Sequence, residues 1–435
     1  MRIPIVVTWK KIAAAGALGV VGALAVGWSG LVSVAANTGH LAPVEWFLHW
    51  TLKNAVDTQS LTIAVPADID LSDPVLIQKA AGHFATGCAT CHGAPGVNQT
   101  AEYKSMTPTP PRLETQGGEW KDRELFWIGQ HGIKYSGMPS WATQERPDEV
   151  WAMVAFLRAL PDMTPETYRE LALGGADGRP APVGQASVDL TAMDEIALAD
   201  CARCHGEDGR GRVTEFGNGS TRGAFPSIAG QPEAYLLETL RAYASGRRES
   251  GYMQPAATRY PDEVLARLAS HFAGQPPGGP VGGDTPGTSP GLPETPTKST
   301  ASGPVPQNRL IDAEASAASR QAIDAIVDPA AGHGAPRTRD GLLELGEMVA
   351  TRGLAPQKVP ACESCHGGTG RARNPLYPYL SGQPAWYIST HLVLWKEGHR
   401  GGTKAADLMD DIAIHLTDQQ IEAVSLWYAQ QPAGR

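Results

Sequence analysis

The longest uninterrupted apolar stretch of the chain lies near its N-terminus. It runs from Ile12 to Ala36 without a charged residue, and three basic residues precede it. As a helix this stretch would extend about 37 Å, enough to cross the hydrocarbon core of a bilayer. The basic flank would stay in the cytoplasm, so the rest of the chain would face the periplasm. We expect residues 1–36 to form a membrane anchor, and a signal peptide cleaved after the small residues 34–36 is the alternative.

The next apolar pattern follows directly, within residues 37–72. Trp46, Phe47 and Trp50 fall on one face of a helix predicted over residues 42–57. Such a face fits the membrane interface, where tryptophan gathers. It would equally suit a membrane partner or the surface of the first folded domain. We interpret the remainder of this segment as a connector.

Beyond the connector, apolar residues recur at helical spacing in an order of elements that occurs three times. A helix leads into a cysteine motif, a proline-bearing loop follows, and a polar turn with a methionine precedes a last helix. Val150, Val154 and Leu157 show the 3.6-residue period in one such last helix. The pattern predicts an all-α fold with three domains in tandem after one transmembrane helix. The predicted domain boundaries are 73–173, 187–274 and 341–432.

The second and third domains are separated by a segment of different composition. Residues 275–307 are dominated by Pro, Gly, Ser and Thr, and residues 308–340 show no clear periodicity. A segment that is poor in apolar residues and rich in Pro and Gly behaves as a semi-extended tether. We therefore expect a Pro/Gly-rich linker over residues 275–340.

The charge balance excludes one class of partner. The chain has 36 Lys and Arg against 45 Asp and Glu, a formal net charge of −9. A nucleic-acid-binding protein needs a basic face, so we expect no nucleic-acid partner. An acidic protein is suited to docking on basic patches of other proteins, although charge alone selects none.

All six cysteines fall in three copies of the motif Cys-x-x-Cys-His. This motif is the attachment signature of c-type haem. Each thiol bonds one vinyl group of the same porphyrin, and the histidine places an imidazole on the iron. The sequence therefore predicts three covalently bound haem c groups. The attachment residues are Cys88, Cys91, Cys201, Cys204, Cys362 and Cys365, and the histidine ligands are His92, His205 and His366.

A Cys-x-x-Cys pair can also bind zinc, act as a redox pair or form a structural disulfide. A zinc site would need two further ligands for each metal. A thioredoxin-like redox pair would lie in a βαβ pattern, which the sequence does not show. Structural disulfides form the third alternative. None of the three accounts for the histidine that follows the second cysteine in every copy.

A methionine follows each motif at a matched distance. Met138, Met253 and Met409 lie 50, 52 and 47 residues after the first cysteine of their motifs. Methionine is the soft axial ligand that raises the reduction potential of an electron-transfer haem. We predict these three as the sixth ligands of the iron. Met106 and Met348 are rival candidates that fall outside the shared position.

Two shorter repeats lie between motif and methionine. Each domain has Pro-x-Leu or Pro-x-Ile there, and we expect Pro111, Pro226 and Pro378 to accept a hydrogen bond from the ligating histidine. The phrase Gly-Gln-Pro occurs at residues 230–232 and again at 382–384, and each copy is followed by Gly-x-Arg, which ends at Arg248 and Arg400. The first domain lacks this phrase, so the second and third domains are the closer pair.

These motifs resemble the class I c-type cytochromes over most residues from 73 to 432. The second and third domains together resemble the tandem di-haem cytochromes c. The whole layout is similar to the tri-haem cytochrome subunits of bacterial membrane-bound dehydrogenases. The anchor and the long linker depart from that pattern, and the linker leaves open whether the second and third domains pack rigidly face to face.

The apolar N-terminal stretch places the protein in the bacterial inner membrane, with its haem domains facing the periplasm. The resemblance implies that it relays single electrons from a dehydrogenase to the respiratory chain, with ubiquinone or a terminal oxidase as acceptor. We expect no enzymatic activity of its own, but the role of an electron-transfer subunit in an oxidoreductase complex. The alternatives are the electron-donating cytochrome of a terminal oxidase complex and a haem enzyme such as a peroxidase.

A peroxidase needs an open or displaceable sixth position on the iron, and three well-placed methionines argue against one. Several histidines outside the motifs are nevertheless available to replace a methionine. They are His131, His271, His391, His399 and His415.

Overall fold

The structure is a computed structural model of the whole chain. The residues it describes are 8–35, 38–67, 69–174, 190–215, 221–278, 338–367 and 374–433. Most of the expected linker, residues 279–337, lies outside the described residues.

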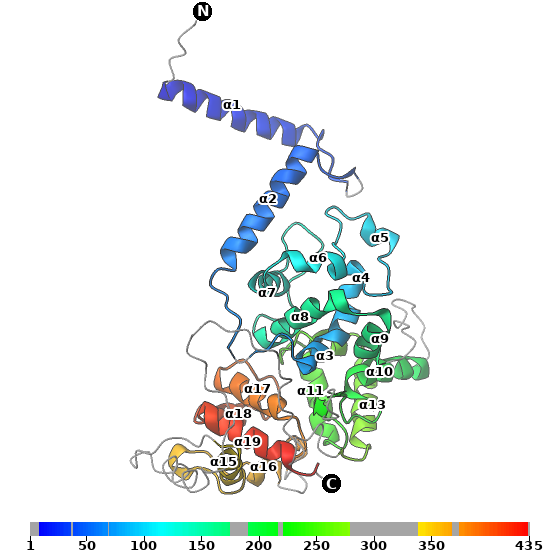
Figure 1. Cartoon of the computed structure of the whole chain (residues 1–435), viewed down its shortest axis with the longest axis vertical. Coiled ribbons are helices and arrows are strands. Elements are labelled where there is room, and N and C mark those ends of the chain that lie inside the picture. The colour runs from blue at the N-terminus through cyan, green and yellow to red at the C-terminus, as the bar shows by residue number, and fades with distance from the viewer. Residues whose placement is uncertain are drawn as a thin grey trace, which may run out of the picture.

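The N-terminal helix α1 (Trp9–Trp28) projects away from the rest of the molecule (Figure 1). It begins where the Thr8 side chain accepts a hydrogen bond from the Lys11 amide, and all of its residues are exposed. Within the described parts of the chain it is the one helix long and apolar enough to cross a membrane. A signal sequence has the same properties. The apolar N-terminal helix is therefore confirmed, while the choice between anchor and signal peptide stays open.

Helix α2 (Ala42–Gln59) has two halves with different surroundings. Trp46, Phe47 and Trp50 in its first half are all more than half exposed. In its second half, Val56 is fully buried, and Asp57 pairs with side chains at the start of α7 (Asp122–His131). The aromatic face therefore does not pack on the first domain, which eliminates one of its three expected surroundings.

The first domain is built on a helix that runs into its cysteine motif. Helix α3 (Pro74–His83) continues through a π-helical turn, Phe84–Cys88, into α4 (Ala89–His92). Phe84 is fully buried and its ring lies 4.8 Å from that of Phe156. The other elements of this domain are α5 (Ala101–Lys104), α6 (Leu113–Gln116), η3 (Gly117–Glu119), α7, α8 (Pro147–Ala159), η4 (Leu160–Asp162) and α9 (Pro165–Leu173).

The other two domains repeat this plan in shorter form. The second consists of α10 (Leu190–His205), β1 (Val213–Glu215), β2 (Thr221–Gly223), α11 (Glu233–Ala244), α12 (Met253–Thr258) and α13 (Asp262–Ala273). The third consists of α15 (Arg339–Thr351), η7 (Ala355–Gln357), α16 (Glu363–His366), α17 (Ala385–Lys396), α18 (Ala406–Ala413) and α19 (Asp418–Gln430). Each of the three domains has its own cluster of buried apolar residues. The all-α prediction with three domains is confirmed, apart from the short antiparallel β1–β2 hairpin.

In each domain the first helix packs against a later helix. The pairs are α3 with α8, α10 with α13, and α15 with α19. In the third domain this packing depends on Gly346, because a Cβ there would meet the backbone of Ala423. Helix α19 starts with a capping box, in which Thr417 and Gln420 satisfy each other's backbone amides.

The second and third domains pack directly on each other through two glutamines of the repeated Gly-Gln-Pro phrase. The Gln231 side chain donates to the Tyr379 carbonyl at 3.0 Å and accepts from the Tyr379 amide at 2.9 Å. Reciprocally, Gln383 donates to the Ser227 carbonyl at 2.7 Å and accepts from the Ser227 amide at 3.0 Å. The question that the linker left open is thus answered, because the two domains share a defined interface.

Candidate haem sites

Each Cys-x-x-Cys-His motif lies at the C-terminal end of a helix, and its histidine is the last residue of that helix. The helices are α4, α10 and α16. All six cysteines are free thiols, so the structure forms none of the disulfides that spacing alone would allow. In the described parts of the chain, no three His, Cys, Asp or Glu side chains gather as metal ligands. The three motifs are thus separate, each with two thiols and one imidazole.

The three motif histidines are oriented alike. Each is at least nine-tenths buried, and its Nδ1 lies within hydrogen-bond distance of a proline carbonyl. A carbonyl can only accept, so Nδ1 carries the proton and Nε2 keeps its lone pair for a metal. Burial also lowers the pKa of all three rings, which favours the neutral form. The pairs are His92 with Pro111 at 2.7 Å, His205 with Pro226 at 3.0 Å, and His366 with Pro378 at 2.8 Å, as predicted from the sequence.

The thiols lie in surroundings that disfavour a charged sulfur. Burial raises the pKa of Cys88, Cys201 and Cys362 to about 12, and that of Cys204 to about 11. A thiolate that served as a redox nucleophile would need the opposite shift. A thioether carries no charge, so these buried positions are suited to sulfur that is bonded to a porphyrin.

Two of the three predicted methionines share a cavity with their motifs. A cavity of about 650 Å³ extends between the second and third domains, and Met253 and Met409 both line it together with His205 and His366. Met253 is the first residue of α12. Met409 lies inside α18 and not in a polar turn as predicted, because the surrounding Ala and Leu residues favour a helix. The structure therefore brings the predicted ligands of these two domains to one internal space.

The first domain differs in this respect. Neither His92 nor Met138 lines that cavity. Met138 is partly buried in a turn after α7, and a Cβ on the neighbouring Gly137 would meet the side chain of Met106. The predicted ligand and its rival Met106 therefore lie at the same end of the domain, while Met348 packs against the core of the third domain.

Comparisons with known proteins agree with this geometry. Residues 76–157 match the family described as cytochrome C oxidase, cbb3-type, subunit III, and residues 194–267 match the family cytochrome c. The chain is 36% identical over 74 residues to cytochrome c-554(548) of Halomonas halodenitrificans, a stretch that covers 17% of this chain and 88% of that protein. The chain belongs to the c-type cytochromes.

Longer matches connect this cytochrome with two further proteins. It is 28% identical over 234 residues to the thiosulfate dehydrogenase electron acceptor of Thiomonas intermedia, across 54% of this chain and 79% of that protein. It is 26% identical over 235 residues to cytochrome c4 of Pseudomonas aeruginosa, across 54% of this chain and 85% of that protein. This is a multi-domain electron-transfer cytochrome related to both.

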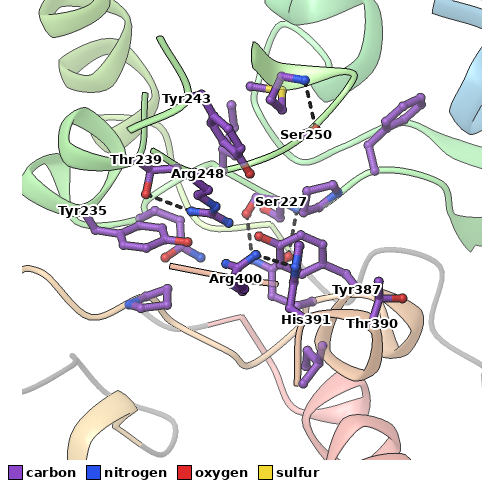
Figure 2. Close-up of a pocket in the computed structure, with 18 of the residues that line it drawn as sticks. Ser227, Tyr235, Thr239, Tyr243, Arg248, Ser250, Tyr387, Thr390, His391 and Arg400 are labelled. Atoms are coloured by element: carbon purple, nitrogen blue, oxygen red, sulfur yellow. Dashed lines mark hydrogen bonds between the residues drawn. The ribbon is translucent and has the colours of Figure 1, made fainter. Parts of the chain in front are cut away.

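Buried cations from all three domains of the cytochrome line the shared cavity. Arg248 donates to Thr239 at 3.3 Å, and Arg400 contacts His391 (Figure 2). Lys79 of the first domain lies 3.2 Å from the centre of the Trp386 ring, where burial lowers its pKa to about 7. Among the described residues, no carboxylate forms an ion pair with Lys79, Arg248 or Arg400.

Among the residues that the structure describes, three buried donors in this cavity have no hydrogen-bond partner. They are Arg248 Nε, Trp395 Nε1 and the hydroxyl of Tyr428. Buried donors without acceptors, and cations that no described carboxylate neutralises, call for an anionic group in the cavity. The propionates of haem c meet that need, so the residues present fit the group that the motifs imply. The sequence had shown Arg248 and Arg400 as a repeat, but it did not reveal this role.

Proposed function

We propose that this cytochrome relays single electrons between a dehydrogenase and the respiratory chain. One haem-binding domain would span each of residues 73–173, 187–274 and 341–432. The observation that carries the proposal is the cavity between the second and third domains, because it contains two attachment motifs, two methionines and unpaired buried cations. Such an arrangement suits two one-electron centres in one protein interior.

Within each domain the residues have separate tasks. The two cysteines would hold the porphyrin by thioether bonds, and the histidine and methionine would close the iron from both sides. Haem c supplies a one-electron iron couple, whose potential a methionine ligand raises. The proline carbonyl fixes the histidine ring, and the buried cations would neutralise the propionates.

The relatives indicate the class of donor. The Thiomonas relative is described as an electron acceptor of thiosulfate dehydrogenase. We therefore infer that the donor of this cytochrome is a dehydrogenase in the periplasm, and that an enzyme oxidising a sulfur oxyanion is the first one to test. Ubiquinone or a terminal oxidase would accept the electrons.

We place the haem domains on the periplasmic side of the inner membrane, with α1 as a retained anchor. The exposure of every residue of α1 supports this placement, since no described part of the protein covers it. Determination of the mature N-terminus from purified membranes tests it. An N-terminus beyond residue 36 would show that α1 is a cleaved signal peptide instead.

Two further functions have less support than electron relay. The match of residues 76–157 to a cbb3-type oxidase subunit favours an oxidase as a direct partner. A peroxidase would need one iron without methionine. Of the five candidate replacement histidines only His391 lines the shared cavity, and its Nδ1 is already in contact with Arg400. Electron relay therefore remains the better-supported function.

Substitution of the methionines by leucine tests the ligand assignment. We expect three covalently bound haems by intact mass in every variant, because the bonds from the cysteine sulfurs to the porphyrin do not involve methionine. Met138→Leu, Met253→Leu and Met409→Leu should each remove one contribution to the weak far-red absorption band of methionine-ligated ferric haem. Met106→Leu and Met348→Leu serve as controls and should leave the band unchanged. A full band in a variant of the first set would overturn that assignment.

A further inference from the structure

The segment that leads to Met253 in the second domain is short. It joins α11 to α12, and Ser250 lies three residues before Met253. The Ser250 hydroxyl oxygen accepts from the Met253 amide at 3.1 Å and from the Tyr252 amide at 3.3 Å. The position of Met253 therefore depends on where the Ser250 hydroxyl is held.

That hydroxyl is held by the first domain. Ser250 Oγ donates to Glu149 Oε1 at 2.6 Å, and the Gly251 amide donates to Glu149 Oε2. The Tyr252 hydroxyl donates to the Glu149 backbone carbonyl at 2.8 Å. One residue of the first domain thus binds three consecutive residues of the segment that leads to Met253.

Glu149 is itself fixed on both sides. It lies in the first turn of α8, is 3% exposed, and pairs with Arg146 at 2.9 Å. Trp141 Nε1 donates to its Oε2 at 3.3 Å. Burial, with the nearby Asp148, raises the pKa of Glu149 above its usual value, and Arg146 together with the donors of Ser250 and Gly251 offsets part of this shift. Every partner of the side chain is a donor, and this set of contacts suits a carboxylate and no other side chain of this size.

The fit around the segment leaves little freedom. A Cβ on Gly251 would meet the indole of Trp141, and the Tyr252 ring lies 5.8 Å from the Trp141 ring. Glu249 accepts from Thr143 Oγ1 at 2.8 Å. The segment therefore lies in a pocket of the first domain, and it cannot shift without breaking several contacts at once.

We propose that Glu149 of the first domain is a positioning residue for the sixth ligand of the second domain. It holds the Ser250–Tyr252 segment so that the Met253 thioether faces His205, and docking of the first domain thereby sets the methionine ligation and the reduction potential of the second haem. The inference rests on the proposed function, since it takes Met253 as a ligand.

Glu149→Gln in the full-length, haem-loaded protein is the decisive variant. The amide keeps the shape of the side chain but must present an N–H₂ group to donors of Ser250, Gly251, Trp141 or Arg146. We expect three haems by intact mass, loss or displacement of one contribution to the far-red band, and a shift of one of three redox waves to lower potential. Glu145→Gln, a half-exposed carboxylate of the same domain that pairs with His399, is the matched control and should change neither.

A double-mutant cycle separates positioning from a simple charge effect. In a Met253→Leu background, Glu149→Gln should produce no further shift of that wave, because the ligand on which it acts is gone. The same shift in both backgrounds, or an unchanged band and titration in Glu149→Gln alone, would overturn the proposal. Ser250→Ala provides a second route if Glu149→Gln does not fold, since it removes only the bridging hydroxyl and should weaken the same contribution.

The cycle also distinguishes this proposal from the function on which it rests. If Met253→Leu alone leaves the far-red band complete, Met253 is not a ligand, and both the assignment and its positioning by Glu149 fall. If Met253→Leu removes one contribution to the band but Glu149→Gln and Ser250→Ala leave the band unchanged, only the positioning role is wrong.

Discussion

The second domain has two interfaces, and they are built on different principles. Towards the third domain, each side uses the same residue types at matching positions. Gln231 and Gln383 each bind the backbone of the other domain, and Arg248 and Arg400 approach the shared cavity from opposite sides. An interface between two similar domains can be self-complementary, so that one motif, used twice, satisfies both sides.

Towards the first domain, each contact between described residues occurs once. Arg222 pairs with Asp73 at 2.7 Å, and Arg212 donates to the carbonyls of Glu170 and Leu171. The contacts of Glu149 described above belong to this interface as well. The comparison shows that an interface between two similar domains can be visible in the sequence as a repeated motif. The interface with the first domain uses contacts that occur once, so no repeat in the sequence marks it.

The largest effect is expected from a substitution that disrupts the interface between the second and third domains. Gly402 has φ +81°, and a Cβ there would meet the backbone of Arg247 in the second domain. We expect Gly402→Ala to weaken docking of the third domain by about 3 kcal/mol, from left-handed strain together with overpacking. Hydrogen exchange at the Ser227 and Tyr379 amides measures this loss of docking free energy.

Gly398→Ala is the matched control for that variant. Gly398 has φ +76°, but nothing lies near its would-be Cβ, so it should cost only the backbone strain of about 1–2 kcal/mol. Equal loss of protection in the two variants would show that the contact with Arg247 does not matter.

The next prediction sharpens the symmetry of the same interface. Gln231→Ala and Gln383→Ala each leave one backbone N–H and one C=O without their partner, partly buried at Tyr379 and buried at Ser227, which costs about 2 kcal/mol in each case. We expect equal losses in the free energy of unfolding, with faster exchange of the Tyr379 amide in the first variant and of the Ser227 amide in the second. Clearly unequal losses would show that the interface is not functionally symmetric.

The smallest effect concerns pH at the other interface. His83 lies between the rings of Trp141 and Tyr252, at 4.8 and 5.2 Å, and burial, aided by Arg259, lowers its pKa to about 4. When the first domain undocks, the pKa returns towards its usual 6.5, so the undocked state binds more protons between these two values. Docking is therefore strongest above pH 6.5 and weakens as the pH falls towards 4.

At pH 5 we expect a loss of about 1 kcal/mol in docking free energy, after allowance for the partial exposure of the ring. Hydrogen exchange of residues 249–253 at pH 7 and pH 5 measures it, and His83→Gln should remove most of the difference. A pH dependence that persists in His83→Gln would assign the effect to another group.

Much of each haem site could be predicted from the sequence because it is local. Cys-x-x-Cys-His fixes three groups within one turn, and the histidine reaches a proline carbonyl only 12 to 21 residues away. Helices with a clear apolar period, such as that at residues 147–159, were found where the pattern predicted them. Local spacing determines these features, so no knowledge of the tertiary fold was needed.

The rest depends on contacts between distant residues. Glu149 meets Ser250 and Gly251 across about 100 positions, and nothing in the sequence around either partner marks them as a pair. The glutamines and arginines of the repeated phrase were visible, but their role follows only from the packing of two domains. The composition of the linker predicted neither the contacts of Glu149 nor the packing of the second domain on the third. Composition governs the reach and flexibility of a linker, and it does not determine which surfaces of the domains meet.

The contact between Gly82 and Cys204 has a consequence for the order of assembly. A Cβ on Gly82 would lie 2.9 Å from the Cys204 sulfur, so helix α3 of the first domain lies directly over this thiol of the second. A covered thiol cannot be reached by the machinery that joins it to a porphyrin. We therefore expect haem attachment to the second domain to finish while the first domain is still undocked. Docking of α3 over Cys204 would then be a late step in the assembly of the protein.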